Sequence, residues 1–182
     1  MGDGPLFDVE ATAARPASAL ARLADGIGRG AAWLFLVAVA ISGYEVLMRY
    51  AFGSPSAWAH VTVTALCTVG FAVGGAFAMA RGEHIRISVL ADRAAPGAQR
   101  IMSIVGLLVG VLYLAGLAWG FWIQVEEAVW RFGSDGGWRP ELTPGPPNWP
   151  LPALMKVVLL ASTILFALVV LDRLAAALRR RN

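Results

Sequence analysis

The sequence predicts an all-α integral membrane protein with four transmembrane helices. Of its 182 residues, 58% are hydrophobic and only 15% are charged, and the mean hydropathy is +0.64. A soluble domain of this size would need a more polar surface. Four apolar stretches have the length of roughly 20 residues with which a helix crosses a hydrocarbon core of about 30 Å: residues 31–50, 58–80, 101–125 and 151–171.

The four stretches are continuously apolar, which favours helices over the alternating pattern of membrane strands. The first stretch does not resemble a cleavable signal peptide, because it begins far from the N-terminus and is too long for such a segment. It also ends in "YEVLMRYAF", which offers no small-residue cleavage site. We therefore expect residues 31–171 to form one four-helix transmembrane domain.

Basic residues gather in three segments: before the first stretch, between the second and third, and after the fourth. By the positive-inside rule, these segments are cytoplasmic. Both termini are then cytoplasmic, with residues 1–30 as an N-terminal segment and 172–182 as a basic tail. The pI of about 9.6 is explained by this topology, and nothing else indicates a nucleic-acid partner.

Within the N-terminal segment, "ASALARLADGIGRG" places Leu20, Leu23 and Ile27 on one helical face. Two interpretations fit this pattern equally well. The segment is either a short interfacial helix that lies on the membrane, or a cytoplasmic tail that continues directly into the first spanning helix.

The connection over residues 126–150 is rich in proline and glycine, so no long regular element is expected through its second half. It also carries Trp130, Trp138 and Trp149. Tryptophan is enriched at membrane surfaces, which favours interfacial anchors. A docking surface for an extracytoplasmic partner is the second interpretation.

Two opposite charges stand near the end of the first stretch, in "GYEVLMRYAF". Glu45 precedes Arg49 by four residues, so in a helix the two side chains share a face in the favourable order for an ion pair. The pair either snorkels to the membrane surface, or faces protein and fixes this helix against another helix or subunit. An ion-coupling role for Glu45 would require further carboxylates in the other spans, whose central portions have none.

The two histidines do not predict a haem site. His60 and His84 lie at opposite ends of the second span, about 36 Å apart along a helix, so they cannot clamp one haem. The lone Cys67 has no partner in the chain for a disulfide or a cysteine metal site. The sequence shows no phosphate-binding loop, zinc-protease motif or nucleophile elbow, and we expect neither enzyme activity nor a cofactor in this chain.

Two segments together resemble a known family. The first is "EVLMRYAFGSPSAW", and the second, one helix later, is "GGAFAMARGEHIRISVLADR". At this separation within four apolar spans, they are similar to the DctQ-like small membrane subunit of tripartite ATP-independent periplasmic (TRAP) transporters. The motif positions are Glu45, Arg49, Tyr50, Phe52, Pro55, Trp58, Gly82, Glu83, His84, Ile85 and Arg86. One departure is visible after the tryptophan, where relatives often carry acids and this chain has Ala59, His60 and Val61.

The resemblance implies a small permease subunit in a bacterial inner membrane. Such a subunit pairs with a large membrane subunit that holds the substrate and sodium sites, while a periplasmic binding protein delivers an organic, typically carboxylate-bearing, solute. The residues expected to act in structure and assembly are Glu45, Arg49, Tyr50, Trp58, Glu83, His84 and Arg86. The alternatives are a self-contained small transporter or channel that uses Glu45, and an anchor subunit of a redox complex.

Overall fold

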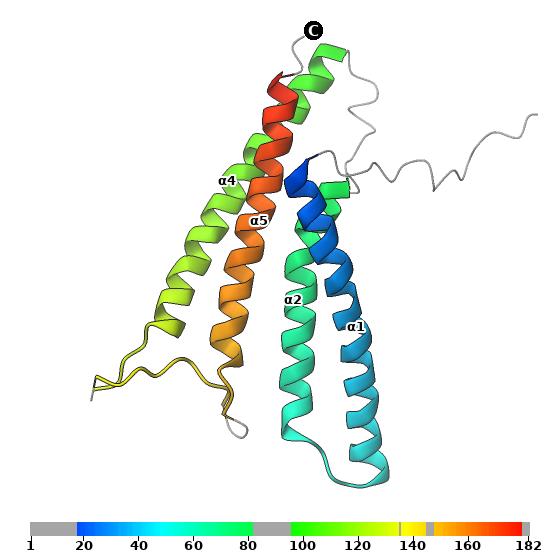
Figure 1. Cartoon of the computed structure of the whole chain (residues 1–182), viewed down its shortest axis with the longest axis vertical. Coiled ribbons are helices and arrows are strands. Elements are labelled where there is room, and N and C mark those ends of the chain that lie inside the picture. The colour runs from blue at the N-terminus through cyan, green and yellow to red at the C-terminus, as the bar shows by residue number, and fades with distance from the viewer. Residues whose placement is uncertain (1–17, 82–95, 135, 145–147, 180–182) are drawn as a thin grey trace, which may run out of the picture.

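The computed structural model describes residues 18–81, 96–134, 136–144 and 148–179. These residues form four long helices (Figure 1). Within the described ranges there is no β-strand, only an isolated bridge between Phe132 and Trp138. All four helices are long and apolar enough to cross a membrane, as the sequence predicts. They are α1 (Ala19–Ala51), α2 (Ala57–Arg81), α4 (Pro96–Val129) and α5 (Leu151–Arg179).

The helices are longer than the apolar stretches that predict them. The N-terminal segment forms no separate interfacial helix within its described part, because α1 runs without a break from Ala19 and is capped by Ser18, whose Oγ accepts a hydrogen bond from the Ala21 amide. At its other end the chain continues α5 to Arg179, well into the segment expected to be a tail. With 33 residues, α1 is about 50 Å long and therefore exceeds the hydrocarbon core.

The helices pack in the order α1, α2, α5, α4. The α1–α2 and α4–α5 pairs are antiparallel hairpins, and α2 and α5 join them (Figure 1). Among the described helices, α4 contacts only α5. The α1–α2 and α4–α5 loops lie at one end of the bundle, and the start of α1 and the end of α5 lie toward the other. The bundle is therefore open, and much of α1 and α4 faces outward.

The core lies where α1 begins and α2 ends. It consists of small residues that let the backbones approach closely: Ala21, Ala24, Ala76 and Ala80, with Val169 of α5. Glycines make similar contacts further along, where Phe35 packs on Gly70 and Phe166 lies against Gly75. The four-residue spacing of glycines in the sequence indicates these contacts only in part. A Cβ atom at Gly110 would contact Val170, whereas one at Gly74, Gly106, Gly116 or Gly120 would have no atom of a neighbouring helix within 4 Å.

Candidate functional site

Glu45 binds the start of the next helix. Its Oε1 accepts a hydrogen bond from Arg49 Nη2 at 2.9 Å, and its Oε2 accepts one from the Ser56 amide at 3.0 Å and another from the Ser56 hydroxyl. Ser56 directly precedes α2. A carboxylate at this position satisfies a helix-end amide and interacts favourably with the helix dipole. Glu45 therefore joins the last two turns of α1 to the residue that precedes α2.

The exposure of the two charged side chains differs. The Glu45 side chain is 14% exposed and the Arg49 side chain 55% exposed. The carboxylate therefore faces its own chain, whereas the guanidinium reaches outward. Whether the pair fixes this helix against another subunit stays a prediction, and the outward side of Arg49 leaves room for such a contact.

The loop between α1 and α2 is shaped by a glycine and two aromatic rings. Gly53 has a φ of 62°, a conformation that other residues rarely adopt, and the Ser54 amide donates to the Met48 carbonyl oxygen. Beside it, the rings of Tyr44 and Trp58 stack with centroids 5.9 Å apart. The geometry of this corner thus depends on backbone and aromatic contacts in addition to the ion pair.

The other sequence-predicted residues are not part of this corner. Tyr50 is among the most exposed side chains of the described chain. His60 is exposed, and its carbonyl oxygen accepts a hydrogen bond from Thr64. The predicted assembly residues Glu83, His84 and Arg86 lie outside the described residues. The described part of the chain contains no group of three or more metal-ligand side chains.

A second carboxylate that links α1 to α2 lies at the opposite end of α1, and sequence reasoning did not single it out. We call the contacts of Glu45 and those of Asp25 the two carboxylate clamps. Asp25 is buried, with 7% of the residue exposed. Its Oδ1 accepts a hydrogen bond from Arg81 Nε at 2.8 Å, and its Oδ2 accepts one from Arg29 Nε at 3.0 Å. The Arg81 guanidinium also lies 4.9 Å from the centroid of the Phe77 ring. Asp25 therefore ties the start of α1 to the end of α2.

Helix α5 also binds at this end of the α1–α2 pair, through an arginine. Arg173 Nη2 of α5 donates a hydrogen bond to the Ala80 carbonyl oxygen at 2.8 Å. Ala80 is among the last residues of α2, where carbonyl groups lack partners within the helix. The ends of α1, α2 and α5 are thus joined by polar contacts around the small-residue core.

The described part of the α4–α5 loop is held by hydrogen bonds in spite of its prolines and glycines. The indole Nε1 of Trp138 donates to the Val129 carbonyl oxygen at 2.6 Å, and the Arg139 amide donates to the Arg131 carbonyl oxygen at 2.8 Å. Lys156 of α5 forms an ion pair with Glu141, which fastens the loop to the beginning of that helix.

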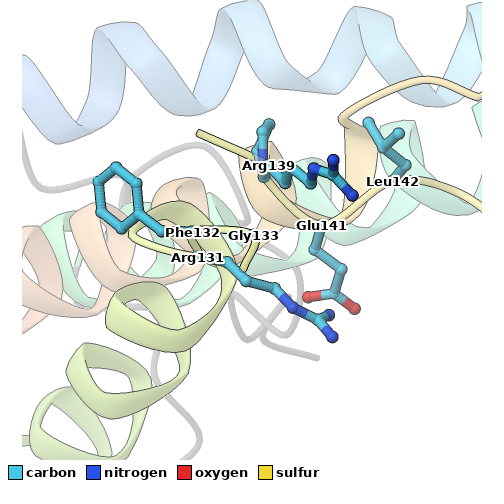
Figure 2. A pocket seen from close by; sticks show the side chains of 7 residues that line it. Arg131, Phe132, Gly133, Arg139, Glu141 and Leu142 are labelled. Atoms are coloured by element: carbon cyan, nitrogen blue, oxygen red, sulfur yellow. The ribbon is translucent and has the colours of Figure 1, made fainter. Parts of the chain in front are cut away.

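A hollow of about 420 Å³ opens in this loop (Figure 2). In Figure 2 the Arg131 and Glu141 side chains extend toward the same region, and Phe132 points away from them. We call this feature the loop hollow, defined by its lining residues Arg131, Phe132, Gly133, Arg139, Pro140, Glu141 and Leu142.

A comparison with protein-family models matches residues 38–180 to the DctQ component of tripartite ATP-independent periplasmic transporters. The match covers most of the chain, including parts of α1 and all of α2, α4 and α5. The chain belongs to the DctQ family. Among curated proteins, none matches the sequence.

Membership of the DctQ family confirms the resemblance drawn from the Glu45–Trp58 and Gly74–Arg93 segments. The matched range contains one carboxylate clamp completely and the other only in part. The Glu45 clamp lies entirely within the matched residues, whereas Asp25 and Arg29 precede them and their partner Arg81 lies inside. The Asp25 clamp therefore attaches the N-terminal extension of α1 to the DctQ helices.

Replacing Glu45 by alanine should expose the start of α2. The Ser56 amide loses its carboxylate acceptor, so its hydrogen exchange should become at least several-fold faster. Arg49→Ala is the matched control, since it removes the other half of the ion pair and leaves both Ser56 contacts in place. Equal Ser56 exchange in the two variants would contradict a clamping role for Glu45.

Proposed function

We propose that this chain is the small permease subunit of a TRAP transporter in a bacterial inner membrane, with both termini cytoplasmic. In this role it braces a large membrane subunit, which carries the sodium and substrate sites, during uptake of an organic, carboxylate-bearing solute. A periplasmic binding protein delivers that solute. The observation that carries the proposal is the DctQ match over residues 38–180.

The arrangement of the helices supports a bracing role. The α1–α2 pair is clamped at both ends by carboxylates, which makes it a stiff unit. Both α1 and α4 present large apolar side chains outward along their length, among them Trp33, Val39, Leu112 and Trp119. Lipid and a second membrane protein are the two surroundings that suit such faces.

The alternative of a self-contained transporter that uses Glu45 has less support. Both Glu45 oxygens already accept hydrogen bonds from Arg49 and Ser56, so little acceptor capacity remains for a dehydrated cation. A coupling site for sodium normally gathers several oxygen ligands. We therefore assign sodium coupling to the large subunit.

Co-expression with the large permease subunit tests the proposed function. We expect the two chains to purify as a stable heterodimer, and liposomes that contain both, with the binding protein and a sodium gradient, to accumulate solute. Liposomes that contain either membrane chain without the other should not. Solute uptake by this chain without partners, abolished by Glu45→Gln, would instead establish the self-contained transporter.

A further inference from the structure

The loop hollow lies outside the membrane helices, at the same end of the bundle as the α1–α2 loop (Figure 1). Its walls are held by backbone hydrogen bonds, including Gly133 N to Gly137 O at 2.8 Å and Glu141 N to Ala128 O at 2.8 Å. A preformed wall loses little conformational entropy when a partner binds. The hollow is therefore suited to recognition without reorganisation of the loop.

The side chains in and around the hollow are of the kinds that dominate protein interfaces. Trp130, Phe132 and Trp138 are 64%, 59% and 60% exposed, although each is large and apolar. Leu142 and Arg131 are also exposed. Tryptophan and arginine are the residues most enriched among those that contribute most to binding energy. Their concentration on a short ordered loop indicates a contact surface.

The charge of the hollow indicates the chemistry of its occupant. Two arginines line it, Arg131 and Arg139, and Glu141, the carboxylate among its described lining residues, is engaged by Lys156. The Arg131 side chain has no hydrogen-bond or ion-pair partner among the described residues. An exposed guanidinium beside aromatic rings binds a carboxylate in two-point geometry. The hollow is thus complementary to an acidic side chain.

A soluble protein fits these features better than a lipid surface does. Glu126 and Glu127, both exposed at the end of α4, would repel a layer of anionic headgroups. Neither of them lines the hollow, so a single acidic loop can enter it beside Arg131 without meeting these two carboxylates. We propose that the loop hollow is the docking site for an acidic surface loop of the solute-binding protein, an inference that rests on the proposed function.

The test is the affinity of the solute-binding protein for the complete small-and-large-subunit complex in nanodiscs of phosphatidylcholine. Arg131→Glu reverses the charge at the hollow, and we expect it to weaken binding at least about tenfold, with a weaker dependence on salt than the wild-type complex shows. The matched control is Arg22→Gln, which changes an exposed arginine of α1 at the opposite end of the bundle and should leave the affinity unchanged. Phe132→Ser should weaken binding without any change of charge.

Gel filtration of each variant complex separates this inference from the proposed function. Failure of the wild-type chains to form a heterodimer would reject the proposed function. An intact heterodimer in which Arg131→Glu binds the solute-binding protein as tightly as wild type would reject the docking site alone. An effect of Arg131→Glu that appears only in nanodiscs containing phosphatidylglycerol would also reject it, and would assign Arg131 to lipid headgroups.

Discussion

Alanine at Gly28 should separate the start of α1 from the end of α2 and lower the free energy of unfolding by about 2 kcal/mol, within the range typical of overpacked cores. A Cβ atom at Gly28 would lie 2.3 Å from Phe77 Cδ2 and 2.6 Å from Phe77 Cβ. Because Phe77 Cβ is fixed to the α2 backbone, rotation of the ring cannot relieve the overlap. The helices must move apart at this point of close contact.

The same helix provides matched controls. Gly26 and Gly30 flank Gly28, and a Cβ atom at either would meet no other atom within 4 Å. Alanine at these positions should be neutral or should stabilise α1 by about 0.5 to 1 kcal/mol, because glycine is a poor helix former. The free energy of unfolding of all three variants can be measured by denaturation in mixed detergent micelles, with circular dichroism as the signal. Similar values for Gly26→Ala and Gly28→Ala would show that Phe77 does not hold the helices as described.

The number and type of the helices were predictable, because hydrophobic length is the strongest signal in a membrane protein. Their ends were not. The charged and small residues from Ala19 to Gly30 lower the hydropathy of that segment, yet its helix continues because Ser18 caps it and Ala21 and Ala24 pack on α2. Hydropathy identifies the residues that can lie in the hydrocarbon core, whereas helix ends depend on caps and tertiary contacts.

The Glu45–Arg49 pair was predictable from its spacing alone, since four residues in a helix bring the two side chains together. The Ser56 contact was not, because it depends on a turn that Gly53 makes possible. Asp25 and Arg29 have the same spacing as Glu45 and Arg49. Their importance was missed because the deciding partner, Arg81, is 56 positions away in the sequence.

The two clamps give α1 a common design at its ends. At each end an acid accepts a hydrogen bond from an arginine four residues later. Asp25 accepts a further one from Arg81 of α2, and Glu45 accepts two from Ser56, the residue before α2. The hairpin is thereby fixed in register along its whole length, and neither helix can slide on the other without breaking a charged contact. The proposed bracing role requires this property, because a helix pair that slides would transmit no force to a partner subunit.

Asp25→Ala should produce the other large loss of stability, about 2 kcal/mol, which is in the range of hydrogen bonds to charged groups. The substitution removes the carboxylate shared by Arg29 and Arg81. It leaves the partly buried Arg81 guanidinium, whose side chain is 27% exposed, without this counter-charge. The loss should appear both in micelle unfolding and as faster hydrogen exchange of the first two turns of α1.

Arg29→Ala distinguishes a link between helices from a helix-surface ion pair. The Arg29 side chain is 65% exposed and bonds Asp25 within the same helix, so its loss should lower the free energy of unfolding by less than about 1 kcal/mol. Asp25→Asn keeps the size of the side chain and removes its charge. Its loss in the free energy of unfolding should lie between those of Asp25→Ala and Arg29→Ala. If Asp25→Ala were no more harmful than Arg29→Ala, the bond to Arg81 would contribute little, and the α1 extension would be held by the contacts of Ala21, Ala24 and Gly28 alone.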